Sequence, residues 1–139
     1  MEGSSLAWPL PPIMARDAPL RRPLLGMIVY KIIATAEWAE AEAAGAFTGA
    51  AIDRAAGFIH FSTAEQAPET AAKWFAGRGD LTLAAIDADA LGDDLRWEPS
   101  RGGALFPHLY AALPMSAVLW SRPLALGQDG AHVFGSLEA

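Results

Sequence analysis

The stretch Met27-Ile28-Val29-Tyr30-Lys31-Ile32-Ile33 decides how the fold begins. It is apolar and rich in β-branched residues with a single lysine, which is typical of a strand. Thr35 follows at the position of a helix N-cap, and Gly45 stands where a helix would end. We therefore expect a strand that leads directly into a helix from Thr35 to about Ala44.

Outward from this unit the sequence predicts short strands and one more helix. Residues 57–62 have the composition of a strand. Thr63 and Gln66 have the spacing of a capping box, so we expect a helix to about residue 76, with Pro68 as an alternative first residue. Three later strands are expected at residues 81–87, 95–98 and 117–126, the last interrupted by Pro123. Two early helices followed mainly by strands favour an α+β fold with a mostly antiparallel sheet over a doubly wound fold.

Residues 1–26 differ from the rest of the chain. They show no sustained periodicity and hold five prolines, Pro9, Pro11, Pro12, Pro19 and Pro23. These prolines break any apolar run that a signal peptide or a membrane span would need. We interpret residues 1–26 as a flexible N-terminal extension or as the product of a start codon assigned too far upstream, and we favour the second. Residues 27–139 are expected to form a single globular domain.

The composition narrows the classes of partner. The formal net charge is −6, which argues against general binding to nucleic acid and against binding to an anionic membrane. The chain has no cysteine, so it has no disulfide, thiolate nucleophile or zinc–thiolate site. Nothing points to an oxidising compartment, and the expected localisation is cytoplasmic. A local basic pocket for a small anion remains compatible with this charge.

Chemically reactive side chains are densest in two adjacent runs, Arg96-Trp97-Glu98-Pro99-Ser100-Arg101-Gly102-Gly103 and Phe106-Pro107-His108-Leu109-Tyr110. The proline after Glu98 disfavours the helical region for Glu98, so its carboxylate is expected at the end of a strand. Arg101 precedes Gly102 and Gly103, two residues that can take positive φ and expose their N–H groups, which suits an anion. The alternative is that Glu98 only forms a surface ion pair with Arg96 or Arg101.

The predicted strand at residues 57–62 carries the second group of candidates. Side chains alternate across a sheet, so Phe58, His60 and Ser62 share one face. By the same rule, Phe106, His108 and Tyr110 share a face if that segment is extended. We expect these faces to meet in one pocket that holds His60, Ser62, Glu98, His108 and Tyr110.

Each candidate also has a structural interpretation. His60 is either catalytic or a hydrogen-bonded structural histidine. Ser62 and Thr63 fit helix caps better than nucleophiles, because the chain has no nucleophile elbow and no triad spacing. A metal site at His60, Glu98 and His108 has suitable ligand types, but the spacing matches no compact motif, so no metal is assigned. The tryptophans at 38, 74 and 120 are assigned to the core.

Three segments resemble, in the same order, a small bacterial family known as domain of unknown function 952. They are residues 57–66 (Gly-Phe-Ile-His-Phe-Ser-Thr-Ala-Glu-Gln), residues 95–100 (Leu-Arg-Trp-Glu-Pro-Ser), and residues 106–110 before Leu113-Pro114. The chain departs from the family pattern at Ala55-Ala56, where an acidic residue is expected, and at Ala111, where glycine usually follows tyrosine. Family members are similar in fold to ADP-ribosyltransferases and RNA 2′-phosphotransferases, whose split sheet binds NAD. The resemblance therefore implies an ADP-ribosyltransferase-like fold.

The same resemblance implies roles for individual residues. Ser62 and Thr63 resemble an element that shapes a nicotinamide pocket, and Glu98 resembles a glutamate that orients ribose hydroxyls. Arg101 and the amides of Gly102 and Gly103 would hold a phosphate or pyrophosphate. The resemblance also implies that Trp97 or Tyr110 stacks on a base of the ligand.

These observations predict an NAD- or nucleotide-dependent transferase, of ADP-ribosyl or glycosyl groups, with Glu98, His60 and His108 as its catalytic residues. NAD is the cofactor that the resemblance implies. The alternative is a non-catalytic module that binds a small anionic ligand or a protein partner through the same cleft.

Overall fold

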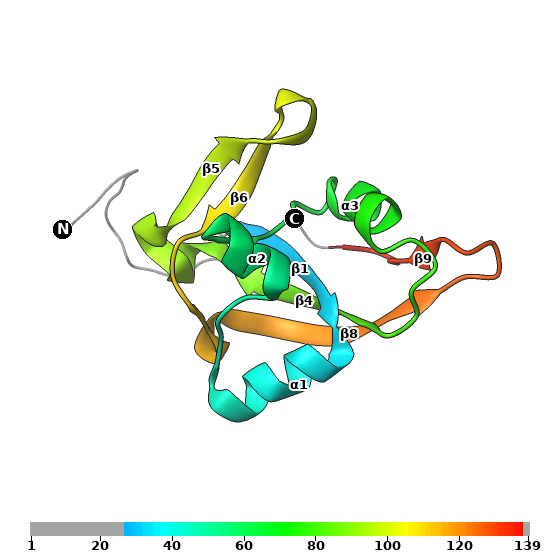
Figure 1. Ribbon diagram of the computed structural model, residues 1–139, viewed down its shortest axis with the longest axis horizontal. Helices are drawn as coiled ribbons and strands as arrows, with labels where there is room; N and C mark the ends of the chain where they lie inside the picture. Colours follow the sequence, from blue (N-terminus) through cyan, green and yellow to red (C-terminus); the bar gives the residue numbers. More distant parts are fainter. Residues whose placement is uncertain (1–26, 138–139) are drawn as a thin grey trace.

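The main sheet has four antiparallel strands in the order β1 (Ile28–Ala34), β4 (Leu81–Asp87), β8 (Val118–Leu126) and β9 (His132–Val133) (Figure 1). The computed structural model describes residues 27–137. Alternate residues of β1 pack into two different hydrophobic clusters, Val29 and Ile33 in one and Tyr30 and Ile32 in the other. Since successive side chains of a strand point to opposite faces, the two clusters show that both faces of the sheet are buried.

Helices lie on both faces of this sheet. α1 (Thr35–Ala44) buries Trp38 and Ala41 in the cluster that contains Val29. α3 (Ala67–Trp74) buries Ala71 in the cluster that contains Tyr30. A third helix, α2 (Ala51–Ala56), leads into the second sheet.

The second sheet contains β3 (Ile59–His60), β6 (Leu105–Leu109) and β5 (Leu95–Pro99), again all antiparallel. It meets β1 at one bridge, where Tyr30 and Ser62 exchange two backbone hydrogen bonds of 2.7 and 2.9 Å. A short ladder joins β2 (Ala46–Phe47) to β7 (Leu113–Pro114). Three 3₁₀ segments complete the described chain, at Ala88–Asp94, Arg101–Gly103 and Met115–Ala117.

The α+β class and the mostly antiparallel pairing are confirmed. The expectation of two early helices is wrong, because α2 makes a third. Pro123 sits inside β8 without breaking it. It pairs with Thr82 on one side, and β9 reaches only as far as Ala125 on the other. The missing N–H of Pro123 thus falls where the strand is an edge.

Two predicted helix starts need correction. Thr35 is not an N-cap, because β1 continues to Ala34 and Thr35 is already helical. Its hydroxyl lies 2.9 Å from that of Thr82. The capping-box bonds between Thr63 and Gln66 do form, at 3.1 and 3.2 Å, but they close a turn ahead of α3, which begins at Ala67.

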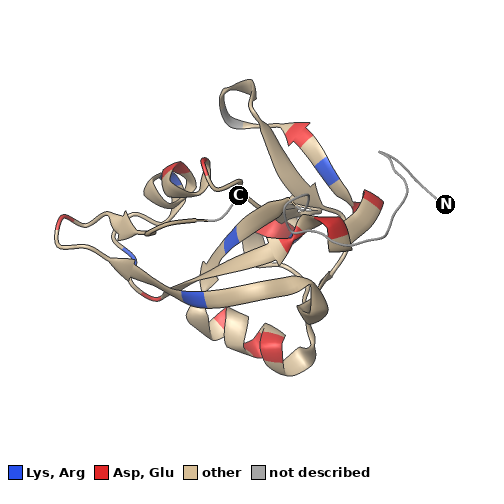
Figure 2. Ribbon diagram, turned by 180° about the vertical axis from the view of Figure 1, so that it is seen from behind, with Lys and Arg blue, Asp and Glu red and all other residues tan. Residues whose placement is uncertain are grey.

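The strand predicted at residues 57–62 is shorter than expected, with only Ile59 and His60 in β3 and Ser62 in the isolated bridge. The expectation for residues 1–26 lies outside the described residues. Between residues 27 and 137, no helix is long and apolar enough to span a bilayer. The basic residues visible in Figure 2 lie on separate elements and do not gather in one patch.

Candidate active site

Two histidines lie opposite each other on neighbouring strands. His60 on β3 pairs in register with His108 on β6. Their ring centroids are 5.6 Å apart. Direct cross-strand partners project from the same face of a sheet, so the register itself brings these imidazoles together.

A buried carboxylate orients the first imidazole. Asp53, which is 1% exposed, lies 2.6 Å through Oδ1 from Nδ1 of His60. The same carboxylate accepts backbone N–H bonds from Ala50, at 2.9 Å, and from His60, at 3.1 Å. Asp53 reaches this position because α2 ends at Gly57, whose φ of 91° turns the chain into β3. With Nδ1 donating to Asp53, Nε2 of His60 is the nitrogen left for chemistry.

Lys31 supplies the charge that balances Asp53. Its Nζ lies 3.0 Å from Oδ2 of Asp53 and donates to the backbone carbonyl of His60 at 2.9 Å. Burial lowers the pKa of Lys31, and the charge of Asp53 offsets part of that effect. Burial alone would raise the pKa of Asp53, but hydrogen bonds from His60, the charge of Lys31 and the backbone donors together hold that pKa well below its usual range.

A second carboxylate orients the other imidazole. Glu98 on β5 lies 2.8 Å through Oε1 from Nδ1 of His108, and it accepts the hydroxyl of Tyr110 at 2.8 Å. These bonds, that from His108 foremost, hold the pKa of Glu98 below its ordinary value. The bond to Glu98 in turn raises the pKa of Tyr110. The guanidinium of Arg96 lies 4.6 Å from the centre of the Tyr110 ring, which places a positive charge over this group.

Phe58 packs against both histidines. Its ring is stacked on His108 with centroids 4.1 Å apart, and its centroid lies 4.6 Å from that of His60. The same ring lies 5.3 Å from that of Tyr110. One aromatic side chain therefore restricts the rotation of both imidazoles.

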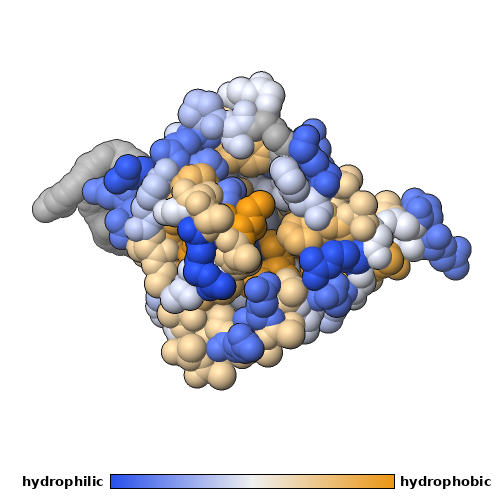
Figure 3. Space-filling model, in the orientation of Figure 1, coloured by the Kyte–Doolittle hydropathy of each residue, from blue (hydrophilic) through white to orange (hydrophobic). Residues whose placement is uncertain are grey.

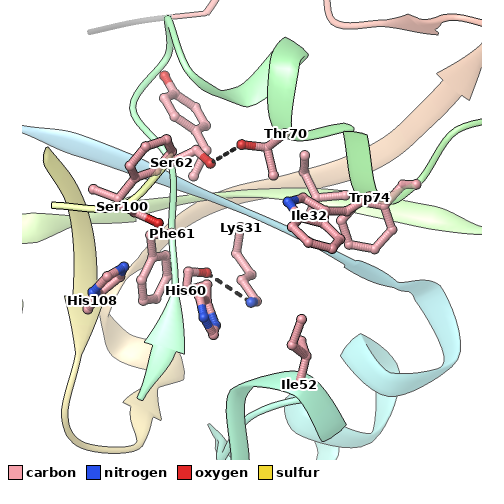
Figure 4. A pocket seen from close by; sticks show the side chains of 13 residues that line it. Lys31, Ile32, Ile52, His60, Phe61, Ser62, Thr70, Trp74, Ser100 and His108 are labelled. Carbon is pink, nitrogen blue, oxygen red and sulfur yellow. Dashed lines mark hydrogen bonds between the residues drawn. The ribbon is translucent and has the colours of Figure 1, made fainter. Parts of the chain in front are cut away.

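The two imidazoles line a pocket of about 320 Å³ between α2, α3 and the second sheet (Figure 4). Figure 3 shows it as a hollow in the face of the molecule, with hydrophobic residues at its rim. Its polar side chains include Lys31, Ser62 and Thr70, and the hydroxyls of the last two lie 3.0 Å apart. Within residues 27–137, no three histidine, aspartate or glutamate side chains are placed to hold a metal ion.

The structure brings together most of the residues in the predicted pocket. His60, Ser62 and His108 line it, and Glu98 lies behind His108. Tyr110 donates a hydrogen bond to Glu98 and lines a different groove, together with Phe58.

Four of the other predicted ligand-binding residues, Thr63, Trp97, Gly102 and Gly103, do not line the pocket. Thr63 is occupied in the turn before α3, and Trp97 is 38% exposed on β5. Gly102 and Gly103 have the expected positive φ of 65° and 81°, but the N–H of Gly103 already donates to Ser100. The side chain of Arg101 lies outside the described part of the structure.

Three residues of the site were not predicted from the sequence. Asp53 lies seven residues before His60 and supplies the acidic partner that seemed absent at Ala55-Ala56. Lys31 was visible only as the single charge in an apolar strand. Trp74 was assigned to the core, which is wrong, because it is 56% exposed and lines the pocket.

Fold and site together define a small α+β protein with two histidine–carboxylate pairs, whose two imidazoles line the same pocket. The chain belongs to the family described as Protein of unknown function (DUF952), which matches residues 32–121.

Solved structures of protein CC0527 from Caulobacter crescentus are similar to this chain. The crystal structure is 54% identical, with a TM-score of 0.75, over 78% of this chain and 95% of that one. The solution NMR structure is 55% identical, with a TM-score of 0.69, over 75% of this chain and 90% of that one. No functionally curated protein matches the chain.

Proposed function

We propose that this chain is a nucleotide-dependent transferase that binds a phosphorylated ribose ligand, with NAD as the leading candidate, in the pocket at His60 and His108. One observation carries the proposal. Two imidazoles 5.6 Å apart, each bound through Nδ1 to a carboxylate, line the same pocket. Carboxylates in this position fix the tautomer of a histidine and stabilise its protonated form, as acid–base catalysis requires.

The two imidazoles divide the proton transfers of a group-transfer reaction. In its neutral form one ring accepts, at Nε2, the proton of the attacking hydroxyl or water. In its protonated form the other ring donates a hydrogen bond, or a proton, to the group that leaves or to a phosphate oxygen. Asp53 and Glu98 act through the histidines and are positioning residues. The family resemblance to ADP-ribosyltransferases supports NAD as the donor.

The chain offers a matched control for testing this proposal, because it has three histidines. His132 lies outside the pocket, with its Nε2 2.7 Å from the carbonyl of Arg78. The assay follows nicotinamide release and ADP-ribose transfer from NAD. We expect His60→Gln and His108→Gln to lower kcat by about 10² to 10⁴, the usual contribution of a general acid or base, and His132→Gln to leave it unchanged.

Ligand binding is measured separately, by NMR titration with NAD, ADP-ribose and mononucleotides. Shifts of the His60 and His108 ring signals support the proposal. Binding without turnover would favour a module for a small anionic ligand. If the ring signals of neither His60 nor His108 shift at millimolar ligand, the proposal is overturned and a protein-binding module is favoured.

A further inference from the structure

The pocket has a polar side and an apolar side. In Figure 4, His108 and Ser100 lie on one side of the cavity, and Trp74 and Ile52 lie on the other, with His60 and Lys31 between them. The side chains at the apolar side are accessible, since Ile52 and Trp74 are both 56% exposed. A ligand that fills this pocket therefore meets the imidazoles at one end and the indole at the other.

The packing of α3 explains why Trp74 faces the pocket. Ala67 and Ala71, four residues apart, are buried against the sheet. Thr70 and Trp74 have the same spacing on the adjacent face of the helix, and both line the pocket. The helix ends at Trp74, so the indole stands at the rim. Nζ of Lys73 lies 5.8 Å from the centre of the indole ring, which adds a cation at this rim.

We propose that Trp74 is the stacking platform for the aromatic base of a mononucleotide unit, whose ribose and phosphate extend toward His60 and His108. This rests on the function proposed above and identifies the part of the site that selects the ligand. A nucleotide matches the two ends of the pocket, because the flat faces of its base stack on aromatic side chains and its ribose phosphate is polar and anionic. A flat indole face accepts any base by stacking.

The size of the pocket favours one nucleotide unit. A volume of about 320 Å³ is at the lower end of the range of about 300–1,000 Å³ for small-molecule pockets. Of the two aromatic residues implied by the family resemblance, neither Trp97 nor Tyr110 lines this pocket. Ile52 on α2 adds apolar surface on the same side of the pocket as Trp74.

The test compares two exposed tryptophans and two ligands. Calorimetric titrations with AMP and with ribose 5-phosphate are run on the wild type, Trp74→Ala, Trp74→Phe and Trp97→Ala. We expect Trp74→Ala to weaken AMP binding by about tenfold, which is about 1.4 kcal/mol and within the usual contribution of base stacking. The affinity for ribose 5-phosphate should not change, since it has no base. Trp74→Phe should keep most of the AMP affinity, and Trp97→Ala should keep all of it.

The outcomes separate this inference from the function on which it rests. If AMP and ribose 5-phosphate bind the wild type equally well, or Trp74→Ala binds AMP normally, the stacking role is overturned while binding at His60 and His108 stands. If neither ligand binds the wild type, the proposed function and this inference fall together. Circular dichroism of the Trp74→Ala protein verifies that it is folded.

Discussion

Asp53 is the residue on which most polar contacts of the site converge. It is almost fully buried and accepts hydrogen bonds from Lys31, from the ring and backbone of His60 and from the backbone of Ala50. A buried charge that keeps its partners is tolerated, whereas removal of one partner leaves the other charge without compensation. Stability and the orientation of His60 therefore depend on the same carboxylate.

Asp53→Asn is expected to lower the free energy of unfolding at pH 7 by about 3–5 kcal/mol, because it leaves Lys31 buried without an anion. The folded-state pKa of Asp53 lies below its unfolded value, so its contribution is present above the unfolded pKa and is lost as the pH falls through the folded one. The difference between wild type and variant should therefore narrow below about pH 4. Urea denaturation at several pH values measures this difference in the free energy of unfolding.

A double variant tests the cause of this loss. Lys31→Met combined with Asp53→Asn removes both charges, so it should be more stable than Asp53→Asn alone. A double variant less stable than the single one, or a pH-independent difference, would show that Asp53 does not act as the counter-charge of Lys31.

At the scale of elements, the turn from α2 to β3 sets the site. α2 has six residues, and its C-cap Gly57 donates its N–H to the carbonyl of Asp53 at 2.9 Å. Gly57 has a φ of 91°, which a residue with a Cβ adopts only with strain. This single turn fixes the spacing between Asp53 and His60.

Gly57→Ala is expected to cost about 1–2 kcal/mol of stability and to shift the ring signals of His60. Gly45→Ala is the matched control, because Gly45 is the C-cap of α1, has a φ of 88° and has no atom near an added Cβ, as at Gly57. Gly45→Ala should lower the free energy of unfolding by a similar amount and leave the ring signals of His60 unchanged. Denaturation and NMR of the histidine rings give the two readings. Equal effects of both variants on His60 would contradict the role assigned to Gly57.

The elements that the sequence predicts well are those with a long pattern. β1, β4 and β8 have seven to nine residues each and were predicted from the composition of their segments. β2, β7 and β9 have two residues each, too few for a period, and α2 has less than two turns. Their positions are set by tertiary packing, which a local pattern does not contain.

The candidate site, too, could be predicted only in part. Alternation along the chain was enough to place His60, Ser62 and His108 on one pocket. The pairing of Asp53 with His60 and Lys31 depends on how α2 docks against β1 and β3, so no spacing rule reveals it. Trp74 was misassigned because the sequence does not show which face of α3 meets the sheet.

At the scale of the whole molecule, the core begins almost at the first described residue. Ile28 pairs with Asp87, Val29 is fully buried, and Met27 accepts a hydrogen bond from the N–H of Ala88 at 2.9 Å. Among residues 27–137, both hydrophobic clusters and the pocket draw on residues that follow Met27.

A chain shortened to begin at Met27 is therefore expected to unfold with a free energy within about 0.5 kcal/mol of that of the full chain. Chemical denaturation of the two chains measures this. A chain that begins at Ile32 is the control, and it should not fold, since it lacks half of β1 together with Lys31. Loss of folding on removal of residues 1–26 would place them in the core.

The cross-strand register of His60 with His108 also has a consequence in time. The two residues lie far apart in the chain, and the strand that holds His60 has only two residues in its ladder. Synthesis from the N-terminus makes His60 before His108. Closing so long a loop has an entropic cost that local contacts do not have, which slows the pairing. Until β6 docks beside β3, the two imidazoles of a newly made chain are not held together, so the pair forms only when distant parts of the chain have met.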